Sequence, residues 1–127
     1  MIKHQGYADK VVNFNSLQFG NISPTDIDGF IEYHDKTYIF IETKYNKAQM
    51  PKGQELALER LCDAIQSETK NAFVFFTSHQ DEGVNVEIDI GNSMVVKYRF
   101  KGEWKKPKSP LTLKTAIERL IPNDNTV

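Results

Sequence analysis

The amino-acid sequence predicts a mixed α/β domain in which helices pack on a central sheet. Two short apolar segments, 27–33 and 37–44, flank a polar three-residue turn at 34–36, which is the pattern of an antiparallel hairpin. An amphipathic helical pattern follows at 54–69, and the uninterrupted apolar run 72–78 then suits a strand covered on both faces. A hairpin, a crossover helix and a buried strand, in that order, favour a sheet with one parallel crossover.

The remaining elements have weaker patterns. Residues 7–19 show a weak helical periodicity, and a loop rich in Gly, Asn, Ser and Pro separates them from the first strand. The apolar segments 84–90 and 94–100 flank the pair 91–92, Gly-Asn, which predicts a second hairpin. The last pattern, 112–121, predicts a closing helix that a proline ends.

Length and composition favour one soluble domain over residues 1–127. The chain has 39% hydrophobic and 26% charged residues, as is usual for a globular protein with a single core. No apolar run reaches the length of a membrane span, and the first ten residues lack the apolar segment of a signal peptide. Cys62 is the only cysteine, which excludes an internal disulfide. We therefore expect a cytoplasmic protein that does not contact a membrane.

Charged residues close the most apolar strand of the predicted hairpin. Residues 37–41 are apolar on both faces, yet Glu42 and Lys44 follow directly. Residues two apart in a strand face the same side, and a turn at 34–36 places Asp28 roughly across from Glu42 or Lys44. A surface ion pair would explain these charges but contributes little. Charges at the end of an interior strand need good partners or a chemical task.

Two converging carboxylates and an ammonium have the chemistry of phosphodiester hydrolysis. Carboxylates repel each other, and Mg²⁺ binds one or two of them while keeping several waters and accepting phosphate oxygens. Such an ion acidifies its bound water, while a neighbouring lysine can take a proton or stabilise charge in the transition state. Asp28 and Glu42 are therefore the expected ligands of Mg²⁺, for which Mn²⁺ can substitute, and Lys44 is expected to serve the attacking water. Asp26 shares a strand face with Asp28 and is the alternative ligand.

The stretch "DIDGFIEYHDKTYIFIETK", residues 26–44, resembles the core of the PD-(D/E)XK, or restriction-endonuclease-like, nuclease superfamily. The superfamily pattern is an acid at the start of one strand and (Asp/Glu)-x-Lys at the end of the next. Asp28 matches the first acid, although the residue before it is not the proline of the family name, and Glu42 and Lys44 match the second part. The resemblance covers about residues 7–78. It implies an αβββαβ core, followed here by the C-terminal hairpin and helix.

Members of the superfamily often carry a glutamine on the helix after the lysine, and Gln54 opens the predicted helix here. It shares a helical face with Leu58 and Leu61, which turns it toward the sheet end that holds the acids. The resemblance implies a Mg²⁺-dependent DNA endonuclease of a bacterial or phage-infected cell, similar to phage, junction-resolvase and virus-type repair members. In this role Gln54 orients water, metal or phosphate. One small domain encloses little of a duplex, so a symmetric homodimer that cuts both strands fits the resemblance.

A basic segment supplies candidate contacts to DNA. Residues 97–108 contain six basic residues and one acid, giving +5 in a chain of net charge -1, as is typical of phosphate-binding surfaces. A solvated strand and loop explain the same charges equally well. The candidate nucleic-acid contacts are Lys47, Lys52, Lys97, Arg99, Lys105, Lys106 and Lys108. Tyr98, Phe100 and Trp104 could stack on bases or pack under the last helix.

Two other classes of function stay open at this point. A catalytically inactive nucleic-acid-binding or assembly module would keep the fold without cleavage, and an interaction protein or inhibitor would bind no metal. The complete set of Asp28, Glu42 and Lys44 favours the enzyme over both. The pattern fits duplex, branched or single-stranded DNA, and RNA, equally well. The sequence contains no Gly-rich phosphate loop, Ser-His-Asp pattern or cysteine cluster that would favour another chemistry.

Overall fold

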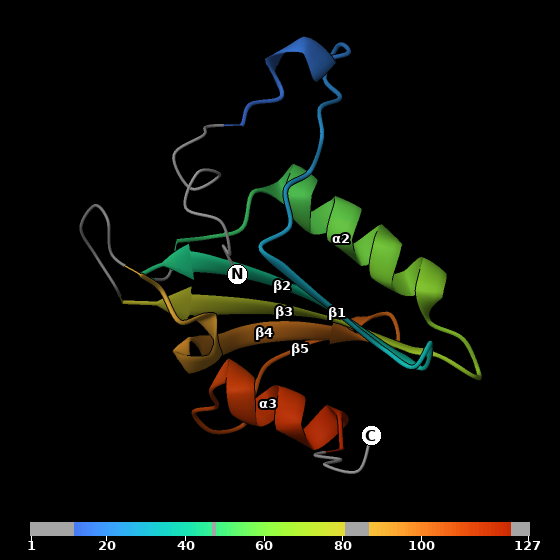
Figure 1. Ribbon diagram of the computed structural model, residues 1–127, viewed down its shortest axis with the longest axis vertical. Helices are drawn as coiled ribbons and strands as arrows, with labels where there is room; N and C mark the ends of the chain where they lie inside the picture. The colour runs from blue at the N-terminus through green and yellow to red at the C-terminus, as the bar shows by residue number, and fades with distance from the viewer. Residues whose placement is uncertain (1–11, 47, 81–86, 123–127) are drawn as a thin grey trace.

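A five-stranded sheet lies at the centre of the residues described by the computed structural model, which are 12–46, 48–80 and 87–122 (Figure 1). Its strands, in chain order and in spatial order, are β1 (Gly29–Tyr33), β2 (Thr37–Tyr45), β3 (Asn71–His79), β4 (Met94–Phe100) and β5 (Glu103–Lys105). β2 and β3 run parallel, and the other neighbouring pairs are antiparallel. The predicted mixed sheet is therefore confirmed.

Within the same residues two α-helices cover the two faces of the sheet (Figure 1). The helices are α2 (Lys52–Ile65) and α3 (Leu113–Leu120), and two short 3-10 turns are η1 (Asn15–Leu17) and η2 (Ile90–Asn92). Thr112 caps α3, because its hydroxyl accepts a hydrogen bond of 3.2 Å from Thr115 N. The predicted helix 112–121 is confirmed. As far as the chain is described, neither helix is long and apolar enough to cross a membrane.

The end of α2 is joined to β3 through the side chain of Gln66. Its amide nitrogen donates to Lys70 O at 3.0 Å, and its amide oxygen accepts from Ala72 N at 3.0 Å. A side chain bonded in this way to the following turn competes with a further turn of helix. α2 therefore ends at Ile65, whereas the sequence pattern predicts a helix that continues to residue 69.

The core consists of two clusters, one on each face of the sheet. Ile39 and Phe73 pack with Leu113 of α3, while Phe40 packs with Leu58 of α2 on the other face. Alternate residues of β2 and β3 supply the two clusters, since successive side chains of a strand point to opposite faces. Both strands therefore need apolar side chains on both faces, and this confirms the predicted interior strand at 72–78.

A tight turn closes the hairpin of β1 and β2 where the sequence predicts one. His34 and Asp35 have φ values of 52° and 56°, and Lys36 N donates to Tyr33 O at 2.9 Å. These two residues are the centre of the turn, and successive positive φ values match the right-handed twist of paired strands; Lys36 completes the three-residue loop between Tyr33 and Thr37. The register of this hairpin places the candidate site, as described below.

Of the second predicted hairpin, the strand at 94–100 is confirmed as β4, whereas the pairing with a strand at 84–90 is not found: 84–86 lie outside the described residues, and the described remainder is not a strand. Residues 87–89 form no strand, and the Asp89 carboxylate instead accepts from Gly91 N at 3.1 Å and caps η2. The hairpin partner of β4 is β5, across a turn at Lys101 and Gly102 with φ values of 51° and 79°. The Lys-Gly pair between two short alternating segments is the sequence signal for this turn.

The predicted helix 7–19 lies partly outside the described residues, since 1–11 are not described. Within 12–19, the described part of this prediction, only Asn15–Leu17 is helical, as the turn η1. Phe19 and Ile22 then pair with each other around Gly20, whose φ is 64°, and this reversal ends the helical path. The described residues thus show a mixed α/β sheet and do not show the complete αβββαβ core that the resemblance implies.

Cys62 tests the packing between α2 and the sheet. Its side chain is fully buried, and burial raises the pKa of the thiol to about 12. We expect a thiol reagent at neutral pH to label native Cys62 roughly 10³-fold more slowly than the urea-unfolded chain, because the thiolate is the reactive form. A Cys62→Ser/Lys36→Cys variant, which moves the thiol to the exposed turn, should react rapidly when folded. Equal labelling rates of Cys62 in the native and unfolded protein would contradict this packing.

Candidate metal-binding and catalytic site

The hairpin register brings Asp28 across from Glu42. Gly29 pairs with Ile41, so the residue before Gly29 lies opposite the residue after Ile41. Asp28 is exposed, and its Oδ2 accepts a hydrogen bond of 2.9 Å from Thr43 N. This bond to the backbone of β2 holds the carboxylate at the carboxyl end of that strand. The predicted placement of Asp28 is confirmed by the register, while its role stays a prediction.

Glu42 is a buried carboxylate with only one of its two oxygens paired. It lies next to Phe76 of β3, and its side chain is 4% exposed. Oε2 lies 3.1 Å from Lys44 Nζ, whereas Oε1 has no hydrogen-bond partner among the described residues. Burial raises the pKa of Glu42, the charge of Asp28 raises it further, and the Lys44 ammonium lowers it. The ionised form of this group therefore destabilises the folded state and lowers the free energy of unfolding.

Gln54 lies in the first turn of α2 and reaches the same place from the helix side. Its amide nitrogen donates to the carbonyl of Asp26 at 3.0 Å. The Gln54 amide also favours the charged form of Glu42 and so lowers the pKa of that carboxyl, although its hydrogen bond goes to Asp26. The carboxylate that raises the pKa of Glu42 is that of Asp28. Asp26 contributes its backbone carbonyl to the arrangement, so the geometry favours Asp28 as the ligand.

The donors at this site fit a cation that needs few protein ligands. The described residues contain no group of three or more His, Cys, Asp or Glu side chains that could hold a metal ion. Zn²⁺ sites use three or four such ligands, while Mg²⁺ is held by one or two carboxylates and keeps several waters. Asp28 and Glu42 are two carboxylates, which is enough for Mg²⁺. Oε1 of Glu42 has no hydrogen-bond partner among the described residues and is therefore free to accept a cation.

A cavity of about 600 Å³ adjoins the site between α2 and the segment 21–26. Asp26 and Gln54 line it from one end, and Arg60 lines it from the next turns of the helix. Arg60 is exposed and is not among the site residues expected from the sequence pattern. Gln54, Ala57 and Arg60 are three residues apart, so they follow one ridge of α2 into the same cavity, and this spacing is the sequence signal for Arg60. An arginine in this cavity could bind a phosphate of a substrate.

Lys97 and Arg99, two predicted DNA contacts, are instead paired with acids of α2. Lys97 Nζ lies 2.5 Å from Glu55 Oε1, and Arg99 binds Asp63 through two hydrogen bonds of 3.1 and 2.6 Å. Trp104, a predicted stacking residue, donates its indole N–H to Glu59 Oε1 at 2.5 Å. Three acids along one side of the helix thus bind β4 and β5. These side chains hold α2 on the sheet, and the charges of Lys97 and Arg99 are neutralised there.

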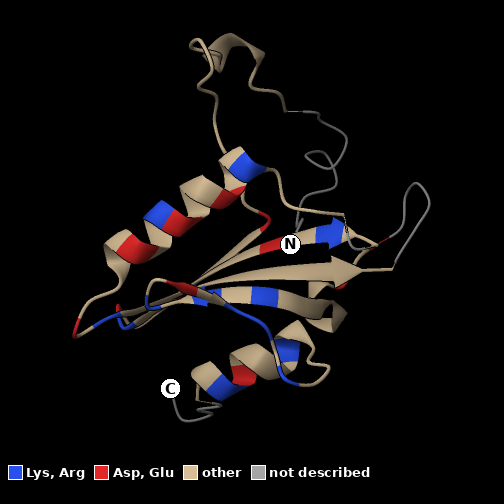
Figure 2. Cartoon of the chain, turned by 180° about the vertical axis from the view of Figure 1, so that it is seen from behind, with Lys and Arg blue, Asp and Glu red and all other residues tan. Residues whose placement is uncertain are grey.

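The other predicted DNA contacts lie elsewhere. Lys52 is exposed at the start of α2, near Gln54, and Lys47 lies outside the described residues. Figure 2 shows basic residues along the segment that runs from β5 to α3, away from α2. Lys105, Lys106 and Lys108 belong to that segment and line a cavity on the face covered by α3. The basic segment of the sequence is therefore divided between two faces of the sheet.

Comparison of the chain with protein-family models, with curated proteins and with solved structures gives no match. The function is therefore inferred from the residues of the site.

The pairing of Arg99 with Asp63 predicts a measurable coupling in stability. We expect Arg99→Met and Asp63→Asn, made singly and together, to give a coupling free energy of about 0.5–1 kcal/mol in urea unfolding, since Asp63 is partly exposed to solvent. Lys108→Met is the matched control, because Lys108 is exposed and makes no ion pair within the described chain. A coupling no larger than that between Lys108→Met and Asp63→Asn would rule out the structural role.

We expect Glu42→Gln to maintain or raise stability, whereas an ordinary substitution in the core lowers it. The amide keeps the shape of the side chain and removes a buried charge that is only half paired. We expect the variant to be as stable as the parent, or more stable by roughly 1 kcal/mol, in thermal unfolding with EDTA present. Thr77→Val, at a fully buried neutral residue of β3 whose hydroxyl accepts from Ser93, should be less stable than the parent. A large loss of stability in Glu42→Gln would mean that this charge supports the fold.

Proposed function

We propose that the protein is a metal-dependent endonuclease that hydrolyses phosphodiester bonds in DNA. The observation that supports it is the state of Glu42, buried at the end of an interior strand with one oxygen on Lys44 and the other without a partner among the described residues. A half-paired buried carboxylate lowers stability, and groups of this kind are concentrated at functional sites. Asp28 lies across the hairpin and supplies the second carboxylate.

In this proposal each residue of the site has one role. Asp28 and Glu42 hold the cation, with Mg²⁺ as the expected ion and Mn²⁺ as its substitute. The bound ion acidifies water and neutralises charge on the phosphate. Lys44, whose ammonium is partly exposed beside Glu42, stabilises negative charge as it develops on the phosphate oxygens. Gln54 orients the water or the phosphate from α2, and Arg60 binds a neighbouring phosphate in the adjoining cavity.

We further propose that the protein acts as a homodimer in the cytoplasm. One chain carries one set of Asp28, Glu42 and Lys44, and both strands of a duplex are cut most simply by two such sets related by a twofold axis. Size-exclusion chromatography with light scattering, in the presence of an uncleaved duplex and Ca²⁺, tests this part separately from cleavage.

A non-catalytic DNA-binding or assembly module is the second candidate. The observation that favours it is the ion pair of 3.1 Å between Lys44 and Glu42, in which each charge neutralises the other and no metal is needed. In that case Lys44 has a structural role. Its removal would lower stability and leave no catalytic step to measure.

Lys44→Ala separates these two functions. We expect the parent protein with Mg²⁺ to nick supercoiled plasmid or to cut branched DNA, and the variant to do so about 10²–10⁴-fold more slowly, because a positioned charge or proton-transfer group acts mainly in the transition state. Lys36→Ala, an exposed lysine in the turn 34–36, is the matched control and should cut at the parent rate. Cleavage by folded Lys44→Ala at the parent rate would remove Lys44 from catalysis, and absence of cleavage by the parent on plasmid, flap and junction substrates would favour the non-catalytic module.

A further inference from the structure

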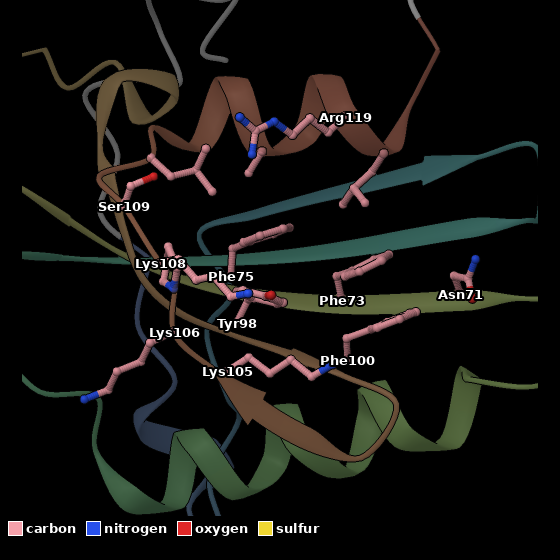
Figure 3. Close-up of a pocket in the computed structure, with 14 residues that line it drawn as sticks. Asn71, Phe73, Phe75, Tyr98, Phe100, Lys105, Lys106, Lys108, Ser109 and Arg119 are labelled. Atoms are coloured by element: carbon pink, nitrogen blue, oxygen red, sulfur yellow. The ribbon is translucent and has the colours of Figure 1, made fainter.

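A second cavity, of about 700 Å³, lies on the face of the sheet opposite the candidate catalytic site. Phe73 and Phe75 of β3 and Tyr98 and Phe100 of β4 form its floor (Figure 3). These rings are arranged in two cross-strand pairs. Phe73 and Phe100 are stacked with centroids 4.4 Å apart, and the centroids of Phe75 and Tyr98 are 5.8 Å apart. The volume is within the range of about 300–1,000 Å³ that is usual for ligand sites.

The cavity exists because α3 is short. An eight-residue helix is about 12 Å long, whereas a nine-residue strand such as β3 extends about 30 Å. Leu113 and Ala116 of α3 are buried against the sheet, while Tyr98 and Phe100 are only half-buried beyond them. Aromatic surface is therefore exposed on the sheet where a longer helix would cover it.

The walls of the cavity carry positive charge and no negative charge. Lys105, Lys106 and Lys108 line one side, and Arg119 of α3 lines the other, as Figure 3 shows. None of the lining residues is an acid, and within the described chain none of these four cations has an ion-pair partner. This differs from the α2 face, where acids neutralise the cations of β4.

Two lysines lie over the ring of Phe100 and have no ion-pair partner within the described chain. Lys105 Nζ lies 6.0 Å from the centroid of the Phe100 ring, and Lys101 Nζ lies 5.2 Å from the same centroid. A cation over a phenyl ring at an exposed site is held only weakly and can turn to an anionic ligand. The cavity thus combines half-buried aromatic rings with lysines on its rim that no acid of the described chain holds.

From this combination we propose that the cavity binds single-stranded DNA, with a base stacked on Phe100 or Tyr98 and the phosphates on the lysines and Arg119. Partly accessible rings next to cations without acidic partners suit single strands, because each nucleotide offers a planar base and a phosphate. Duplex DNA offers phosphates to the cations, but its bases are stacked inside the helix and leave the rings uncovered. The site lies on the other face of the sheet from Asp28 and Glu42, and its binding needs neither those residues nor a metal.

Fluorescence anisotropy with EDTA present tests the proposal on the full chain. A labelled oligothymidylate should bind at least about tenfold more tightly than a duplex of the same length, and at least about tenfold more tightly than an abasic strand with the same phosphates. Lys106→Ala/Lys108→Ala should weaken binding and flatten its dependence on salt. Lys36→Ala/Lys114→Ala, which removes the same charge from exposed positions outside the cavity, should bind as the parent does. Because the assay contains EDTA and measures binding alone, its result does not depend on whether the chain is a nuclease.

The abasic strand tests stacking without changing the protein, so the result does not depend on whether a Phe100 variant folds. Equal affinity for the abasic and the normal strand would overturn the proposal, as would equal affinity for duplex and single strand. Equal weakening by the two lysine double variants would show that only overall charge matters and would overturn it as well. Tenfold tighter binding of oligouridylate than of oligothymidylate would assign the cavity to RNA and reject the DNA assignment. If Phe100→Leu is folded, it should lose affinity for the normal strand and not for the abasic one.

Discussion

The parallel pairing of β2 with β3 is the constraint on which the rest of this structure depends. The pairing extends from Thr37 opposite Asn71 to Tyr45 opposite His79. Two parallel neighbours need a crossover between them and apolar cover on both faces, which α2 and α3 provide. The pairing also places the end of β2 beside the end of β3. Glu42, which follows the apolar residues of β2, is therefore buried next to β3 and does not lie at a free edge of the sheet.

The parts of the fold that sequence patterns predicted are those in which periodicity and turn chemistry agree. The hairpin at 27–44 and the closing helix have both signals, the interior strand at 72–78 is marked by an uninterrupted apolar run, and the structure contains all three. Asp28 and Glu42 could be brought together from sequence because one short turn fixes their register. Residues close in sequence have few alternative pairings, so local patterns are enough there.

The predictions that failed depended on contacts between residues far apart in sequence. The segment 84–90 has the alternation of a strand, but β4, its predicted partner, pairs with β3 and β5, and among the described residues 87–90 Asp89 caps a 3-10 turn. The segment 97–108 appears as one basic block in sequence. In a strand its alternate residues point to opposite faces, and the acids that neutralise Lys97 and Arg99 are 42 and 36 residues away. Spacing within the block could not reveal those partners.

The alternation of β3 has a consequence for how the two proposed sites can vary. Phe73 and Phe75 face the aromatic cavity, while Val74 and Phe76 face α2 on the side of Glu42. A substitution in this strand therefore alters one face and leaves the other intact, so each site can diverge independently. The insertion or deletion of a single residue would exchange the two sets of side chains and remove both sites together. Length variation in relatives of this chain should accordingly be confined to the turns, while β3 keeps a constant length.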